Sequence, residues 1–205
     1  MNKIQIIVNN GAGTGSAVAV WKETKEYLQE NGISYNAYLT RYEKHAVKLA
    51  GQICGKIPQV PIYLLVVGGD GTINEVLNGI TDFDRVRLGV IPTGSGNDFA
   101  RNLGILRDTR EDLREITACI DQEQNGEKLQ RIDLGKVSWE GCEKPRIFGI
   151  SAGAGLDAIV CKKALHSKLK KILNRFHLGK LTYLMLTVQT LFSMRTFQAN
   201  VTTDG

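Results

Sequence analysis

The stretch that decides the fold is LLVVGGDGTINEVLNGI, residues 64–80, in which an apolar run meets a glycine-rich turn and then an amphipathic segment. The glycines of its turn, Gly68, Gly69 and Gly71, each cost about 1 kcal/mol relative to alanine in a regular element. The run IYLLVV at 62–67 has apolar or aromatic side chains throughout, which is typical of a parallel strand buried on both faces. We therefore expect a central strand that turns sharply into a helix.

The same strand-to-helix alternation extends on both sides of this stretch. Strands are expected at 3–9, 34–40, 62–67 and 87–91, and helices at 16–30, 44–54, 73–80, from about 97, and at 109–122. This order predicts a parallel sheet with helices on both faces. Two antiparallel strands around a turn at 140–145, two helices at 157–174 and 179–193 and a strand at 197–203 are expected next. The predicted fold class is therefore α/β, with a parallel-sheet nucleotide-binding domain at 1–128 followed by a mostly antiparallel β-domain at 129–205.

Composition and charge describe an ordinary folded protein with one unusual segment. Of the 205 residues, 42% are hydrophobic and 23% are charged, and the four cysteines are far apart, which favours reduced thiols in a cytosolic protein. The segment 158–203 contains eight basic residues and no acidic one, so the formal charge of +5 is concentrated there. Because the basicity is local, it needs a local explanation.

Glycine clusters follow three of the predicted strands, at 11–15, 68–71 and 94–96. Parallel α/β sheets bind ligands at the carboxyl ends of their strands, so we expect these turns to converge. Backbone N–H groups of such turns, together with the positive end of the following helix, are typical of phosphate sites. Thr72 with Glu75, and Ser95 with Asp98, each fit a capping box, which predicts that a helix begins at each pair and that Glu75 is a cap.

Asp70 has two interpretations. A carboxylate at the tip of a phosphate-binding turn would repel its ligand unless a cation such as Mg²⁺ lay between them. The alternative is that Asp70 accepts backbone N–H bonds within the turn; we favour the metal-linked role. The sequence has no GxxxxGK[ST] loop, and GAGTGSA at 11–17 has Ser16 where the dinucleotide fingerprint requires its last glycine.

Taken together, these motifs carry a resemblance to a known family. GGDGTINEVLNGI at 68–80, followed by LGVIPTGSGNDFARNLGI at 88–105, resembles the catalytic domain of the diacylglycerol kinase family, in particular its soluble bacterial lipid kinases. The resemblance extends to RIDLGKV at 131–137 and to the basic helical segment. It implies an ATP-dependent, Mg²⁺-requiring kinase that phosphorylates a lipid hydroxyl in a cleft between two domains.

The resemblance also implies which residues carry the chemistry. Asp70, Asp98 and Asp133 match an acidic set that organises Mg²⁺, through water, near the transferred phosphate. The general base is expected beyond Gly205, so the resemblance implies a C-terminally incomplete kinase. The implied nucleotide contacts are Asn9, Asn10, Gly11, Ala12, Gly13, Thr40, Gly68, Gly69, Asp70, Gly71, Thr72, Ile73, Asn74 and Ser95.

Two positions depart from the family pattern, and two alternative functions stay open. Asn10 stands where the family usually has proline, and Lys44-His45-Ala46 replaces a typical Gly-Asp-Ala. An NAD kinase also carries a GGDGT-type turn, and a non-catalytic nucleotide- or membrane-binding module is the alternative from another class.

The basic segment predicts where such a kinase would act. Lysines and arginines beside an apolar helix face at 158–180 favour transient contact with an anionic membrane surface. A solvated basic face over an ordinary core is the alternative. We expect a cytoplasmic protein, peripheral to the inner face of the membrane, with a lipid alcohol as substrate and no nucleic-acid partner. A homodimer is compatible with the sequence.

Overall fold

A four-stranded parallel sheet forms the centre of the first part of the chain. The structure is a computed structural model that describes residues 3–9, 11, 16–58, 60–94, 96–105, 108–127, 129–166 and 187–192. The strands β1 (Ile4–Val8), β2 (Tyr35–Leu39), β3 (Ile62–Gly68) and β4 (Val86–Pro92) pair in the order β2-β1-β3-β4. All three pairings are parallel, as expected from the sequence.

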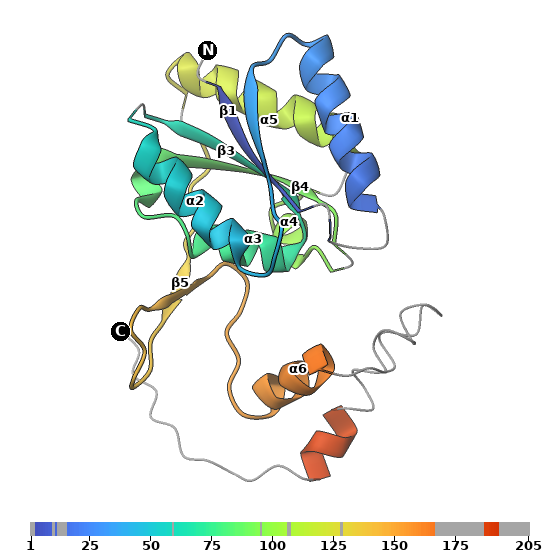
Figure 1. The fold of residues 1–205 in the computed structure, drawn as a ribbon, viewed down its shortest axis with the longest axis vertical. Helices are drawn as coiled ribbons and strands as arrows, with labels where there is room; N and C mark the ends of the chain where they lie inside the picture. Colours follow the sequence, from blue (N-terminus) through green and yellow to red (C-terminus); the bar gives the residue numbers. More distant parts are fainter. Residues whose placement is uncertain are drawn as a thin grey trace. The chain divides into compact units, whose positions relative to one another are not determined.

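Helices cover both faces of this sheet (Figure 1). α1 (Ser16–Glu30) and α5 (Thr109–Gln124) pack on one face of the sheet. There Trp21, Leu28 and Leu113 form a core cluster with the side chains of β1 and β3 that point to this face. α2 (His45–Lys56), α3 (Asp70–Leu77) and α4 (Asp98–Asn102) pack on the other, in a second cluster that includes Leu64 and Val66. Every residue of β1 and β3 is buried, so the expected two-sided burial of the central strand is confirmed.

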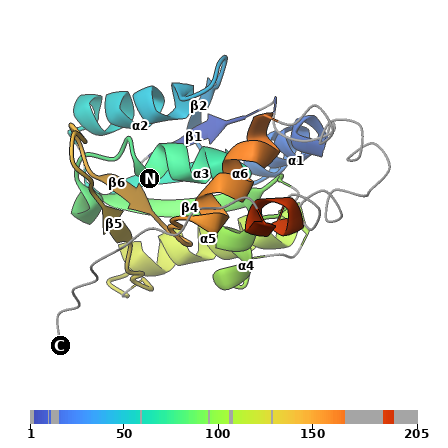
Figure 2. The same cartoon turned by 90° about the horizontal axis from the view of Figure 1, so that it is seen from below.

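Contacts divide the chain into two compact units, residues 1–151 and 152–205. The first also contains η1 (Phe83–Arg85) and a two-stranded antiparallel sheet of β5 (Gly135–Val137) and β6 (Arg146–Phe148), seen in Figure 2. This confirms the expected antiparallel pair, while the predicted domain boundary near residue 128 stays a prediction. The side chain of Asn78, just after α3, attaches β6: its Nδ2 donates to the Ile147 carbonyl at 2.8 Å and its Oδ1 accepts from the Ile147 N–H at 3.0 Å.

The second unit is described only in part. It contains α6 (Leu156–His166) and a helical segment at 187–192. Lys163 Nζ donates to Thr190 Oγ1 at 3.0 Å, which joins these two pieces. The remainder of the predicted helices at 157–174 and 179–193, and the predicted strand at 197–203, lie outside the described residues.

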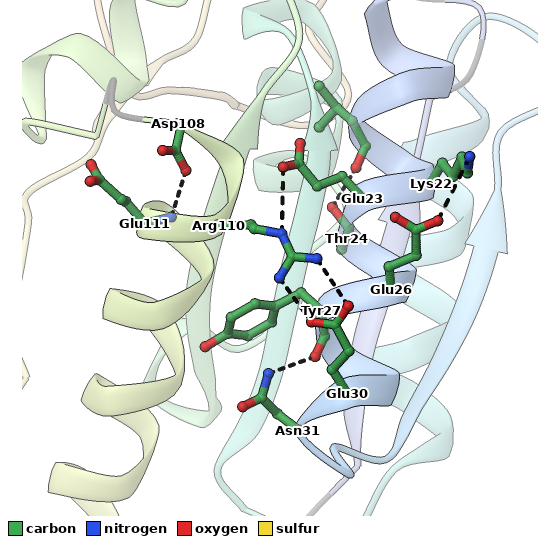
Figure 3. Close-up of polar contacts among 11 residues, drawn as sticks. Lys22, Glu23, Thr24, Glu26, Tyr27, Glu30, Asn31, Asp108, Arg110 and Glu111 are labelled. Carbon is green, nitrogen blue, oxygen red and sulfur yellow. Dashed lines mark hydrogen bonds and ion pairs between the residues drawn. The ribbon is translucent and has the colours of Figure 1, made fainter.

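An arginine joins the two helices of the α1–α5 face (Figure 3). The Arg110 guanidinium donates to both carboxylate oxygens of Glu30, at 2.8 and 3.0 Å, and lies 3.8 Å from Glu23. These hydrogen bonds from Arg110 hold the pKa of the Glu30 carboxyl below its ordinary value. Asp108 begins α5 by accepting the N–H of Glu111 at 2.9 Å, an ordinary N-terminal cap.

Candidate functional site

The strand ends converge at one edge of the sheet. Val8 of β1 is paired with Val67 of β3, and Gly68 of β3 is paired with Pro92 of β4. The three strands therefore end side by side. The Asn9 N–H donates to the Val67 carbonyl at 2.9 Å, and the Thr93 N–H donates to the Gly68 carbonyl at 3.1 Å. The expected convergence of the three turns is therefore confirmed for the part of each turn that the structure describes.

Asn9 connects the first turn to the second. Its Nδ2 donates to Thr72 Oγ1 at 2.8 Å, and its Oδ1 accepts from the Gly11 N–H at 3.1 Å. Thr72 is only 5% exposed, so this hydrogen bond lies under the turn rather than on its surface. Asn9 and Thr72 thus fix how the end of β1 sits against the start of α3.

Close packing explains two glycines of the central turn, and conformational freedom does not. Neither Gly68 nor Gly69 uses the left-handed region of backbone space. A Cβ on Gly68 would lie 2.7 Å from Thr72 Cβ, and one on Gly69 would lie 3.0 Å from Gly94 Cα. Gly69 and Gly94 therefore pass backbone against backbone, which brings the second and third turns together.

Gly71 differs from these two glycines. It lies exposed in the first turn of α3, and a Cβ built there would meet no atom of the described residues within 4 Å. Glycine is unfavourable inside a helix by about 1 kcal/mol relative to alanine. Packing within the described residues does not explain this glycine, whereas the close approach of a ligand would.

The two predicted capping boxes are wrong. α3 begins at Asp70, with Gly69 as its N-cap and no side-chain cap. α4 begins at Asp98, with Asn97 as its N-cap. Thr72 does not cap α3 because its hydroxyl accepts from Asn9, while Ser95 lies outside the described residues. The N-terminus of α3 thus keeps N–H groups that have no acceptor within the helix.

Acidic residues of α3 cap its neighbours instead. Glu75 accepts the N–H groups of Lys44 and Ala46 at the start of α2, at 3.0 and 3.2 Å. Asp70 Oδ1 accepts the N–H of Phe99 at the start of α4, at 3.0 Å. The prediction that Glu75 is a cap is correct in kind, but it caps α2, whose N-cap residue Lys44 lies 31 residues earlier in the chain.

The third turn is held closed by its own side chains. Asn97, at a left-handed φ of 54°, accepts the Gly94 N–H through Oδ1 and donates to the Gly94 carbonyl through Nδ2, both at 2.8 Å. Arg101 donates to the Gly96 carbonyl at 2.8 Å and pairs with Asp98 at 2.5 Å. Sequence reasoning missed these roles, although Asn is a residue type enriched at left-handed positions.

Asp70 and Asp98 both face Gly96. A Cβ on Gly96 would lie 3.0 Å from Asp70 Oδ2 and 3.5 Å from Asp98 Oδ2, so the two carboxylates converge on one point. Asp133 lies exposed just before β5. Among the residues that the structure describes, no group of three or more His, Cys, Asp or Glu side chains is placed to hold a metal ion. The three-carboxylate set therefore stays a prediction, of which the structure brings two members together.

The remaining predicted contacts lie at different depths. Thr40 follows β2, and its N–H donates to the Val8 carbonyl at 2.9 Å, which places it beside Asn9. Ile73 is buried in the core with an exposed fraction of 1%, whereas Asn74 is exposed. Four predicted residues lie outside the described part of the chain: Asn10, Ala12, Gly13 and Ser95.

Thr93 is a polar residue of this edge that no sequence pattern singles out. It is 6% exposed, and its hydroxyl has no hydrogen-bond partner among the residues that the structure describes. A buried hydroxyl without a partner is costly, and in native proteins it asks for an explanation such as a bound molecule or ion. Thr93 immediately precedes the Gly94 turn, so its unused hydroxyl lies within the candidate site.

Comparison with known proteins identifies the family. The family model described as the diacylglycerol kinase catalytic domain matches residues 3–137, which include all four parallel strands and β5. The chain belongs to the diacylglycerol kinase catalytic domain family. The resemblance seen in the sequence is thereby confirmed.

Two curated relatives and one solved structure show what this chain is similar to. "Putative lipid kinase YtlR" of Bacillus subtilis is 29% identical over 94% of this chain and 59% of its own length. A diacylglycerol kinase of the same organism is 36% identical over 69% of this chain and 41% of its own length. A solved structure described as "a putative diacylglycerol kinase from Bacillus anthracis str. Sterne" aligns at 30% identity and a TM-score of 0.49, over 57% of this chain and 39% of that one. The chain thus spans about half the length of these relatives.

Within the described residues, no helix combines the length and the apolar character that crossing a bilayer requires.

Proposed function

We propose that this chain is the nucleotide-binding part of an ATP-dependent lipid kinase, which transfers the γ-phosphoryl group of ATP to a lipid hydroxyl. One observation carries the proposal: α3 caps the helices on either side of it with Asp70 and Glu75, while its own N-terminus has no side-chain cap. Membership of the family supports the same function.

The uncapped start of α3 suits a phosphate group. N–H groups in the first turn of a helix, together with the helix dipole, attract anions. Exposed Gly71 leaves the space beside this turn unfilled, because a methyl group there would meet nothing within 4 Å. The Gly94 turn packs against Gly69 and so lies next to the start of α3, although the Gly94 N–H itself is bonded to Asn97.

Two carboxylates of the site fit a divalent cation. Mg²⁺ is commonly bound by one or two carboxylates, with waters and substrate phosphates as its other ligands. Asp70 and Asp98, which both face Gly96, are the residues that would hold it, and Asp133 is a proposed third member. Bound there, the cation would neutralise charge that develops on the transferred phosphoryl group. The residues of the chain would act by positioning: Asn9 and Thr72 fix the first two turns, and Asn97 fixes the third.

The lipid acceptor rests on the relatives. The two Bacillus subtilis relatives are named "Putative lipid kinase YtlR" and "Diacylglycerol kinase", which supports a lipid alcohol such as diacylglycerol over the ribose of NAD. Contact of 158–180 with an anionic membrane would bring the site to its substrate. Most of that segment lies outside the described residues.

The direct test is phosphoryl transfer. The purified full-length protein is incubated with γ-labelled ATP, Mg²⁺ and a panel that contains diacylglycerol, monoacylglycerol, a sphingoid base, a polyprenol and NAD. We expect label in a lipid alcohol and none in NAD. Label in NAD alone would replace the lipid kinase by an NAD kinase, and ATP binding without transfer to any acceptor would favour a nucleotide-binding module.

A further inference from the structure

The loop between β2 and α2 carries an exposed aromatic ring that folding does not explain. Tyr42 is 58% exposed and belongs to neither hydrophobic core cluster. One face of its ring stacks on His45, with ring centroids 4.3 Å apart and an interplanar angle of 25°. A ring that is supported on one face and exposed elsewhere is suited to stack on a planar ligand.

Hydrogen bonds hold this aromatic pair in place. The Arg41 N–H donates to His45 Nδ1 at 3.1 Å, and the His45 N–H donates to the Tyr42 carbonyl at 3.2 Å. Lys44, between the two rings in sequence, adopts a left-handed φ of 65°, which is unfavourable for a residue with a Cβ. The Glu75 carboxylate stabilises this conformation by accepting the N–H groups of Lys44 and Ala46. The loop is thus anchored to α3, the helix that forms the proposed phosphate site.

The aromatic pair lies at the same edge of the sheet as the phosphate turns. Thr40 N–H bonds to Val8 at the end of β1, and Tyr42 follows two residues later. β2 and β3 are separated by β1 alone, so their ends are two strand spacings apart, about 10 Å. An extended nucleotide can bridge such a separation, with its phosphates at the end of β3 and its base at the end of β2.

We propose that Tyr42 is the platform for the nucleobase of ATP, with the exposed face of its ring stacked on adenine and His45 supporting the opposite face. Glu75 is the positioning residue that holds the loop in register with α3. This inference rests on the proposed function, because it assigns the base end of a nucleotide whose phosphates lie at Gly69 and Gly71.

The test separates the base from the phosphates. Binding of ATP and of inorganic tripolyphosphate, each with Mg²⁺, is measured by calorimetry for the wild type, Tyr42→Ala and Tyr42→Phe. Since base–aromatic stacking is sequence-tolerant and strong, Tyr42→Ala is expected to weaken ATP binding about ten-fold or more and to leave tripolyphosphate binding unchanged. Tyr42→Phe keeps the ring and is expected to bind ATP like the wild type.

Phe83→Ala is the matched control, because Phe83 is also an exposed aromatic residue but lies in η1, before β4, at the opposite end of the sheet. It is expected to bind both ligands normally. If Tyr42→Ala binds ATP as tightly as Phe83→Ala, the platform is refuted while the phosphate site stands. Equal losses of ATP and tripolyphosphate in Tyr42→Ala would show a structural role and also overturn the platform. A wild type that binds neither ligand would overturn the proposed function itself.

Discussion

The replacement of Gly71 by alanine tests whether the glycine is needed for ligand binding or for the stability of the fold. A methyl group at this position would meet no atom within 4 Å, and the backbone is already helical. Alanine should therefore stabilise the protein by about 0.5–1 kcal/mol, through helix propensity and a less flexible unfolded chain. For a chain of this size that corresponds to a rise in Tm of about 1–4 °C.

Nucleotide binding should change in the opposite direction. The methyl group would occupy the space through which a phosphate oxygen reaches the N–H groups at the start of α3. Loss of one hydrogen bond to a charged group costs about 1.5–3 kcal/mol. Since 1.4 kcal/mol corresponds to a factor of ten, the Kd for ATP should rise by about ten-fold to more than one-hundred-fold.

Gly55→Ala supplies the matched control. Gly55 lies exposed near the end of α2, and a Cβ there would also meet nothing within 4 Å. Both variants should show a similar gain in Tm by differential scanning calorimetry, but only Gly71→Ala should lose affinity in a calorimetric ATP titration. Unchanged ATP affinity in Gly71→Ala would refute the reasoning, because the open space would then serve no ligand.

Three further substitutions test separate contacts. Asp70→Asn keeps an oxygen that accepts the Phe99 N–H and removes the negative charge. We therefore expect a folded protein whose kcat in the lipid phosphorylation assay falls by orders of magnitude. Turnover like that of the wild type would exclude the metal-linked role of Asp70. Glu75→Ala leaves two N–H groups at the start of α2 without their acceptor. The free energy of unfolding, measured with urea, should fall by about 1–3 kcal/mol. An unchanged urea midpoint would contradict the capping of α2 by Glu75. Arg110→Ala removes the partner that lowers the pKa of Glu30. A carboxyl with a lowered pKa stabilises the fold above its unfolded pKa, and this stabilisation is lost as the pH falls through the folded pKa. The Tm difference between Arg110→Ala and the wild type should therefore be present at neutral pH and vanish in acid. A Tm difference for Arg110→Ala that does not depend on pH would point to lost packing instead.

The parts of the fold that follow from local patterns were predictable from the sequence. Strand β3 is buried on both faces, as its unbroken apolar run predicts, and α1 spans the residues expected from its periodicity. The meeting of the three turns at one edge also followed, because parallel strands place their carboxyl ends together. Asp133, by contrast, was identified through the family resemblance and not from a local pattern.

The cap assignments failed because their partners are distant in sequence. A capping box recognises residues three positions apart, and Thr72 with Glu75 satisfies that pattern. In the structure the Thr72 hydroxyl is bonded to Asn9, 63 residues away, and Glu75 caps a helix 31 residues away. Thr93 could not be selected from the sequence, because a missing hydrogen-bond partner can be recognised only when the packing around the hydroxyl is known.

The most direct test of the account is a crystal structure of the protein with Mg²⁺ and a non-hydrolysable ATP analogue. We expect the β- and γ-phosphates to lie within hydrogen-bond distance of N–H groups in the first turn of α3, next to the Gly94 turn. Phosphates bound at another edge of the sheet, or a ligand that leaves the N-terminus of α3 in contact with solvent alone, would contradict it.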